Sequence, residues 1–214
     1  MTEDENIEDL KIYFYDSMLT SEQFEADTGG TGYITPKATE MKMSAGVTSE
    51  SFAWINYVGP YFNPLYAELI LKLKLNSKRD MFAFWGFKEG LGNPTFNMIE
   101  SHTGFMISNN KLYVSSANGY TQQRVEIMEI DPTLMYEYKI KNNEFWWKPL
   151  PQIETYLGLP SIRRVERIWK LLQRNTNYPA IDEAHYIIIF VSNLTITEKY
   201  LLLNRIIYKE VYAD

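Results

Sequence analysis

The sequence predicts an all-β protein built as a two-sheet antiparallel β-sandwich. Many short segments rich in aromatic and β-branched residues follow one another at close spacing, separated by turn signals. Residues 66–75 end in strict alternation of apolar and polar side chains, which is typical of a strand with one buried face. Strand and helix signals do not alternate, which argues against parallel βαβ units. At 214 residues, the chain can form one sandwich domain with a sizeable core.

The first half of the chain predicts strands joined by polar turns. Residues 1–10 are acidic and predict a loose lead-in, so the single sandwich domain is expected to span 11–214. Residues 28–32 predict a glycine-rich loop, and residues 76–80 a polar turn before an aromatic return strand. The strands expected in this half are 12–15, 38–43, 52–58, 66–75 and 81–87.

Short strands continue through the second half. Asn109 and Asn110 predict a tight hairpin turn because asparagine tolerates positive φ, and a second hairpin is expected across 141–143. The apolar run 185–191 is typical of a strand covered on both faces. The strands expected here are 96–99, 104–107, 111–115, 124–130, 135–140, 144–148, 185–191 and 201–211.

One segment departs from the strand pattern. Apolar residues recur at helical spacing from Ile162 to Leu172, and Ser161 is a favourable N-cap residue. These features predict an inserted amphipathic helix near 161–174, lying over one edge of the sandwich. It would carry five positive charges against Glu166. Its basic face could be simply solvated, could dock to an acidic partner or to another subunit of a homo-oligomer, or could touch a membrane surface.

Composition excludes several classes of function. The net charge of −6 argues against general nucleic-acid binding, which needs a basic surface. With no cysteine and only two histidines, neither a disulfide nor a multi-histidine metal site is expected, and we predict no metal or cofactor. The sequence contains no apolar stretch of about 18 residues, so no membrane-spanning helix is predicted. The polar amino terminus does not resemble a secretory signal, so a cytoplasmic or virion-associated protein is expected.

Phe84-Trp85-Gly86-Phe87, the run 131–140 and Phe145-Trp146-Trp147 follow one another along the chain, and this order of motifs resembles the concanavalin A-like lectin/glucanase superfamily. Phe84-Trp85-Gly86-Phe87 is similar to its aromatic-Gly-Phe strand, and residues 131–140 to its Asp-x-Thr-x-(His or Tyr)-x-Tyr-x-Ile run. Phe145-Trp146-Trp147 follows as the hairpin partner, although the Asp-Gly usual in the next loop is replaced by Lys148-Pro149. The resemblance covers residues 11–214. It implies a curved jelly-roll sandwich and leaves function open, because one fold serves many functions.

Five residues are candidates for binding a ligand. Asn97, Glu100 and His102 cluster around one predicted strand end, where such groups can hydrogen-bond sugar hydroxyls. Trp85 and Trp146 carry indoles that could stack on a sugar face. Each also has a structural interpretation, as a loop residue that satisfies backbone groups or as a packed core aromatic.

Glycoside hydrolysis would need two carboxylates aimed at one bond. Glu129 and Asp131 would share a strand face and partly match the Glu-x-Asp-x-(x)-Glu motif of laminarinase-type members, but the second glutamate is missing. Glu100 is a further candidate.

Because no complete acid pair is found, a non-catalytic module that binds a glycan or a protein partner is the first hypothesis. A virion or other assembly protein and a divergent glycosidase or polysaccharide lyase are the alternatives.

Overall fold

The computed structural model describes residues 10–12, 24–37, 40–150, 152–156, 159–163, 168–180 and 184–210. Within these ranges the regular structure is β-strand only, and no helix long and apolar enough to cross a membrane is found. The strands are β1 (Leu10–Ile12), β2 (Phe24–Gly29), β3 (Tyr33–Pro36), β4 (Met41–Ser44), β5 (Phe52–Phe62), β6 (Ala67–Leu75), β7 (Met81–Glu89), β8 (His102–Ser108), β9 (Lys111–Ala117), β10 (Gln122–Ile127), β11 (Tyr136–Lys141), β12 (Glu144–Pro149), β13 (Gln152–Tyr156), β14 (Leu159–Arg163), β15 (Lys170–Arg174), β16 (His185–Asn193) and β17 (Tyr200–Glu210).

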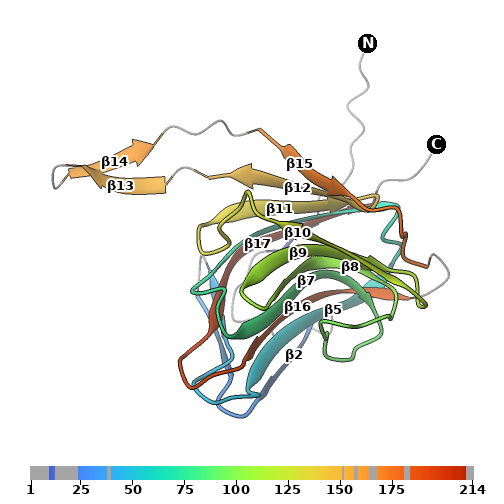
Figure 1. The fold of residues 1–214 in the computed structure, drawn as a ribbon, viewed down its shortest axis with the longest axis horizontal. Helices are drawn as coiled ribbons and strands as arrows, with labels where there is room; N and C mark the ends of the chain where they lie inside the picture. Colours follow the sequence, from blue (N-terminus) through green and yellow to red (C-terminus); the bar gives the residue numbers. More distant parts are fainter. Residues whose placement is uncertain are drawn as a thin grey trace.

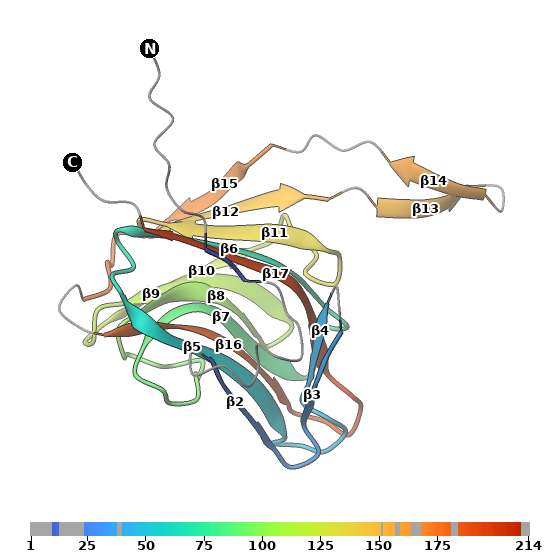
Figure 2. The ribbon, with the colours of Figure 1, turned by 180° about the vertical axis from the view of Figure 1, so that it is seen from behind.

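Two antiparallel sheets face each other, as the predicted sandwich requires (Figure 1). The eight-stranded sheet runs β15-β12-β11-β6-β17-β4-β3, with β1 paired to β17 beside this path. The seven-stranded sheet runs β10-β9-β8-β7-β16-β5-β2. Figures 1 and 2 show the seven-stranded sheet bent into an arch whose outer face is concave.

The core lies between the two sheets. The alternation predicted in β6 is confirmed, because Leu69, Leu71 and Leu73 are fully buried while their neighbours are half-buried. From the opposite sheet, Trp85 stacks on Phe105 with ring centroids 5.8 Å apart. Burying these large apolar side chains supplies most of the driving force for folding.

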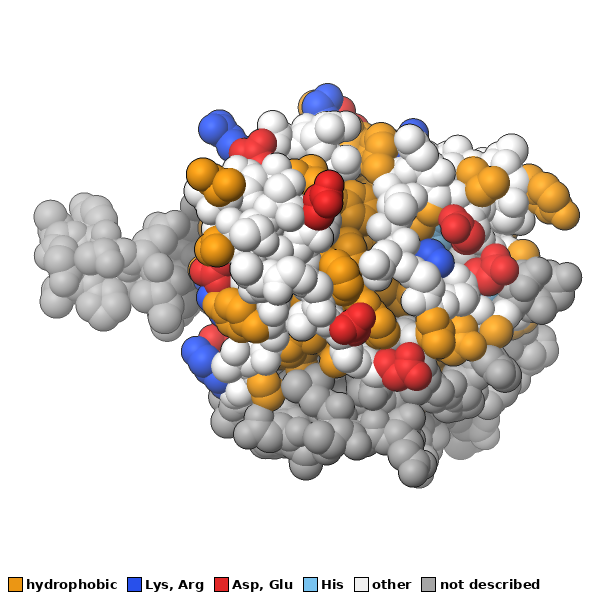
Figure 3. All heavy atoms as spheres, turned by 90° about the horizontal axis from the view of Figure 1, so that it is seen from below, with side chains coloured by type: hydrophobic (Ala, Val, Ile, Leu, Met, Phe, Trp, Pro, Cys, Tyr) orange, Lys and Arg blue, Asp and Glu red, His pale blue; other side chains and the backbone are white. Residues whose placement is uncertain are grey.

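The outer face of the seven-stranded sheet has its own apolar cluster. Phe82, Phe84, Phe190 and Met106 project outward from β7, β16 and β8, and Met98 from the loop 90–101 packs onto them. Apolar side chains therefore run along the middle of this face, with polar ones beside them (Figure 3). The loop 90–101 therefore covers part of the concave face.

The predicted helix over 161–174 is wrong. Residues 161–163 lie in β14 and residues 170–174 in β15, whereas 164–167 lie outside the described residues. β15 pairs with β12, and β13 and β14 form a separate two-stranded extension beyond them (Figures 1 and 2). The apolar residues do not form one buried stripe: Leu172 packs against the core, but Leu171 is 46% exposed. Strand pairing overrides the helical spacing, because a strand also satisfies the backbone.

Other differences concern strand boundaries. The strand predicted at 96–99 is wrong, since these residues form a turn and loop over the concave face. β2 and β3 were not predicted, because their polar and glycine-containing sequences carry a weak strand signal. The strand predicted at 124–130 begins at Gln122 and ends at Ile127. Of the predicted strand 12–15, only Ile12 lies in the described part, where it belongs to β1.

Gly86 and Gly104 lie directly opposite each other on β7 and β8. A Cβ atom on Gly86 would lie 2.4 Å from the carbonyl oxygen of Thr103, which is held in the sheet. We therefore expect Gly86→Ala to lower the free energy of unfolding by about 1–3 kcal/mol, the usual cost of overpacking. Urea denaturation measures this. Gly92→Ala is the matched control, because its Cβ would meet only the Lys88 Nζ atom at 3.9 Å; an equal loss in both variants would contradict the packing argument.

Candidate functional site

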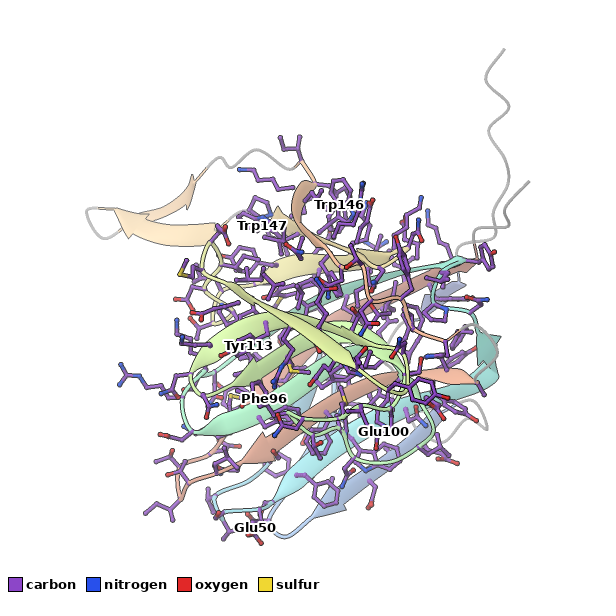
Figure 4. All side chains as sticks on the ribbon, turned by 45° about the vertical axis from the view of Figure 1, so that its right-hand side comes forward. Glu50, Phe96, Glu100, Tyr113, Trp146 and Trp147 are labelled. Carbon is purple, nitrogen blue, oxygen red and sulfur yellow. The ribbon has the colours of Figure 1, made fainter. Side chains whose placement is uncertain are left out.

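A hollow of about 520 Å³ lies at one end of the seven-stranded sheet. We call it the polar hollow. Its walls come from the end of β7, the loop 90–101, the turn between β9 and β10, and the segment before β16 (Figure 4, where Glu100 is labelled). The residues that line it are Glu89, Ile99, Glu100, Asn118, Gly119, Tyr120 and Ala180.

The turn between β9 and β10 is built by Asn118. Its side-chain oxygen accepts hydrogen bonds from the backbone N–H groups of Tyr120 and Thr121, at 3.1 and 3.0 Å. Gly119 takes φ of +89°, which suits glycine. This turn projects Tyr120, which is 86% exposed, at the rim of the polar hollow.

The loop wall is fixed to the sheet by Ser101. Its backbone N–H donates to the Glu89 carboxylate at 3.1 Å. Its hydroxyl lies 2.8 Å from Nε2 of His185 and accepts the backbone N–H of Ala180 at 2.7 Å. Three separate chain segments are thereby joined at one buried serine, so the walls of the hollow are held in register.

A buried imidazole lies beside the polar hollow. His102 is fully buried, and its Nδ1 lies 2.8 Å from the carbonyl oxygen of Glu100. Its Nε2 lies 2.8 Å from the hydroxyl of Ser115. Burial is the main cause that lowers the pKa of His102 from 6.5 to about 4; the charge of Lys88 acts in the same direction, and the hydrogen bond to the carbonyl group of Glu100 opposes it. The ring is therefore neutral at pH 7, with Nδ1–H donating to Glu100.

A buried lysine adjoins this imidazole on the outer face of the sheet. Lys88 is directly opposite His102 and is 3% exposed. Its ammonium donates to the carbonyl oxygen of Glu89 at 2.8 Å. Burial lowers the pKa of Lys88, and the charges of Glu100 and Glu89 oppose this shift. The polar end of the sheet therefore combines one buried cation with two carboxylates at the surface.

An aromatic contact lies further along the same face. Phe96 packs edge-to-face on Tyr113 with ring centroids 5.5 Å apart, and both are labelled in Figure 4. The Arg124 guanidinium lies over the Phe96 ring at 3.8 Å and donates to the side-chain oxygen of Asn97 at 3.2 Å. Asn97 is exposed, but it belongs to this contact and not to the lining of the polar hollow.

The structure brings only part of the predicted binding set together. Glu100 lines the polar hollow, and His102 is buried next to it as a structural group. Trp85, also a predicted ligand-binding residue, has its side chain fully buried between the sheets, away from the polar hollow. Trp146 lies on the other sheet, where its indole N–H donates to Glu144 at 3.2 Å. It therefore cannot act together with Glu100.

The catalytic candidates are also separated. Asp131 closes a local turn, accepting hydrogen bonds from the N–H and hydroxyl of Thr133 at 3.1 and 2.8 Å. Glu129 accepts from the neighbouring N–H of Met128 at 3.2 Å. Glu129 and Asp131 come shortly after Ile127, the last residue of β10, and Glu100 comes shortly before His102, the first residue of β8. In the paired sheet, Ile127 and His102 lie at opposite ends, so the two groups of carboxylates are far apart. The carboxylate that accompanies Glu100 is Glu89, which the sequence analysis missed.

Comparison with solved structures identifies the architecture. The exoplasmic/lumenal domain of VIP36, in its Ca²⁺- and mannose-bound form, superimposes with a TM-score of 0.61 at 9% identity, covering 96% of this chain and 91% of that one. The carbohydrate recognition domain of Emp46p gives 0.54 at 7% identity, covering 89% and 90%. The fold is that of the concanavalin A-like lectins. A protein of unknown function from Shewanella oneidensis MR-1 gives a TM-score of 0.55 at 12% identity, covering 94% and 85%. No protein-family model and no curated protein matches the sequence.

The concanavalin A-like fold raises the question of a calcium ion, since the VIP36 domain is described in Ca²⁺-bound form. Calcium sites need several oxygen ligands, usually with carboxylates among them. Within the described ranges no three Asp, Glu or His side chains lie together in a way that could hold a metal ion. A carboxylate-based calcium site therefore does not fit the part of this chain that the structure describes.

Proposed function

We propose that this chain is a non-catalytic carbohydrate-binding module that holds a short glycan in the polar hollow. The observation that carries the proposal is a hollow lined by two carboxylates, an amide and an exposed tyrosine, at one end of a concanavalin A-like sheet. The VIP36 and Emp46p domains, which share the fold, are a mannose-bound protein and a carbohydrate recognition domain by name.

The lining suits the two kinds of surface that a sugar presents. Carboxylates of Glu89 and Glu100 accept hydrogen bonds from sugar hydroxyls, and bonds to charged groups are the stronger kind. The oxygen of Asn118 is used by the turn, so its amide N–H₂ group is available to donate. Tyr120 and Ile99, which is 54% exposed, offer apolar surface to the C–H groups of a ring.

Because the loop 90–101 covers the centre of the concave face, we expect the ligand to be short. Met98 is 3% exposed and covers the outward-facing phenylalanines of β7 and β16. A long polysaccharide lying across the arch would meet this loop, whereas a terminal sugar reaches the hollow at its end. The proposed ligand is therefore the end of a glycan.

A glycan array with the purified protein tests the proposal. We expect binding to at least one saccharide, reduced about tenfold or more by Glu100→Gln and by Tyr120→Ala, because each removes a contact worth on the order of 1.4 kcal/mol. Trp146→Ala is the matched control on the other sheet and should bind as the native protein does. Calcium and a chelator are included as separate conditions. Absence of binding to every glycan, or loss of binding only in Trp146→Ala, would contradict the proposal.

The polar hollow also allows a second function, the hydrolysis of a glycosidic bond. Two carboxylates in one hollow are what a glycosidase needs, and a solved structure reported with endo-acting O-glycanases shares the fold, with a TM-score of 0.52 at 13% identity over 86% of this chain. Product release from an array ligand, abolished in both Glu89→Gln and Glu100→Gln, would favour this alternative. The assembly role has no support from the named structures.

A further inference from the structure

The polar hollow offers more hydrogen-bond acceptors than donors. Among its described lining residues, the charged ones are Glu89 and Glu100, and an ionised carboxylate only accepts hydrogen bonds. One oxygen of Glu89 already accepts the backbone N–H of Ser101 at 3.1 Å, which leaves its other oxygen for a ligand. The described lining side chains that can donate are the amide of Asn118 and the hydroxyl of Tyr120. The hollow therefore suits a ligand group that is rich in donors.

Glu100 is the more accessible of the two carboxylates. It is exposed at the end of the loop 90–101, whereas Glu89 is half-buried (Figure 4). Within the described ranges, the Glu100 carboxylate forms no hydrogen bond and no ion pair. Both of its oxygens are thus available to a group that enters the hollow.

A buried cation compensates for only one of these carboxylates. The charge of Lys88 interacts with both, but its ammonium is 3% exposed and donates to the backbone carbonyl oxygen of Glu89 at 2.8 Å. In the part of the chain that the structure describes, no ion pair joins Lys88 to Glu89 or to Glu100. Because the neighbouring His102 is neutral at pH 7, two carboxylates face one buried ammonium. The hollow keeps an excess of one negative charge.

We propose that the sugar held in the polar hollow carries a free amino group, so that the ligand is the hexosamine end of a glycan. This inference rests on the proposed function, the binding of a glycan end in the same hollow. A protonated amine has three N–H donors, no acceptor and a positive charge. It therefore matches both the excess of acceptors and the excess of negative charge, and its hydrogen bonds to the carboxylates are charge-assisted.

The exposed tyrosine at the rim offers a further contact to the same group. The turn built by Asn118 holds Tyr120 with 86% of its surface exposed. The face of a tyrosine ring attracts a cation that lies within about 6 Å of its centroid. An amino sugar can thus use its ammonium against a carboxylate and against the ring, while its C–H groups meet Ile99.

The uncharged forms of the sugar match the hollow less well. A hydroxyl group brings one donor together with two acceptor lone pairs, and an N-acetyl group brings a carbonyl oxygen that only accepts. Next to Glu89 and Glu100 that oxygen would meet acceptors, and a buried acceptor without a donor is costly. We therefore expect the free amine to bind about tenfold more tightly than the N-acetylated form of the same sugar, which corresponds to about 1.4 kcal/mol.

Oligosaccharides that end in glucosamine or in galactosamine, each as the free amine and as the N-acetylated form, test this inference through their Kd values for the full chain. At low ionic strength, the native protein should prefer the free amine of at least one pair about tenfold. Glu100→Gln should weaken binding of the free amine about tenfold and of the N-acetylated form much less, so that the preference falls to about twofold. In about 1 M salt, where the screening length is about 3 Å, the preference of the native protein should also shrink.

Glu129→Gln is the matched control, because it removes the same charge at the opposite end of the sheet and should keep the preference. A linker that bears an amine but no sugar controls for general attraction to a chain with a net charge of −6, and it should not bind.

The outcomes separate this inference from the proposed function. Binding of saccharides without a preference for the free amine would overturn the inference and leave the proposed function supported, whereas failure to bind any saccharide would overturn both. An unchanged preference in Glu100→Gln, or an equal loss in Glu129→Gln, would place the charge effect outside the polar hollow and would overturn the inference. Binding of the bare amine linker as tightly as the amino sugar would overturn it as well.

Discussion

Replacing Trp85 by alanine is expected to lower the free energy of unfolding by about 3–5 kcal/mol, the usual cost of removing a large buried aromatic side chain. The indole is fully buried between the two sheets, stacked on Phe105 and edge-to-face with Tyr138 at 5.2 Å. Its removal would leave a cavity that the paired strands around it cannot close. Urea denaturation, followed by circular dichroism, measures the loss as a lower midpoint at an unchanged slope.

Trp85→Phe is the matched control. Within the described residues the indole N–H has no hydrogen-bond partner, so phenylalanine keeps most of the packing and removes an unsatisfied buried donor. We therefore expect a much smaller loss for Trp85→Phe than for Trp85→Ala. If both variants lost the same amount, or if alanine cost less than about 1 kcal/mol, Trp85 would not occupy the core in this way.

The stability of the protein is expected to fall by about 3 kcal/mol as the pH is lowered from about 6.5 to 4, through the protonation of His102. The pKa of this histidine is about 4 in the folded state, against an ordinary value of 6.5, chiefly because burial disfavours the imidazolium. A lowered folded-state pKa means that the unfolded chain takes up the proton first. The stabilising contribution is thus complete above pH 6.5 and is lost as the pH falls through the folded pKa.

The charged groups near this imidazole agree with that direction. Lys88 is directly opposite on β7, and a second charge there would repel the protonated ring. His185 acts in the same sense, whereas the charge of Glu100 acts in the opposite sense.

Stability curves at half-unit pH steps, measured for the native protein and for His102→Gln, isolate the effect. The variant is expected to be less stable at pH 7.5, because it disturbs the bonds to Glu100 and Ser115, but flatter between pH 6.5 and 4.5. An identical slope in both proteins would show that His102 does not cause the acid sensitivity.

Much of the fold could be predicted because the environment of a strand in a sheet determines the local pattern of apolar and polar residues in the sequence. The alternation in β6 and the continuous apolar run in β16 each reflect the surface on which those strands lie. The two predicted hairpin turns are also confirmed, because positive φ angles are found at their asparagines: Asn109, Asn110, Asn142 and Asn143. The segment 161–174, which contains β15, was misread as a helix because its β-branched, leucine and basic residues fit both periods. The available edge of β12 decided between them.

The site could be predicted only in part. Glu100 and His102 were found because they flank one strand start, so they are close in sequence as well as in space. Glu89, Asn118 and Tyr120 lie up to 31 residues apart along the chain, and they meet only when β7, β8 and β9 are paired in one register. No local pattern marks residues that are brought together in this way.

By itself, the sequence determined that most of the chain forms strands, which face of β6 is buried, and the concanavalin A-like resemblance that the structure confirms. These follow from short-range periodicity and from turn residues with restricted backbone angles. Only the tertiary structure decided that Trp85 is core, that Trp146 and Glu100 lie on different sheets, and that Glu89 shares a hollow with Glu100. The physical reason is that both faces of a strand can carry aromatic side chains, and packing between sheets selects which of them remain exposed.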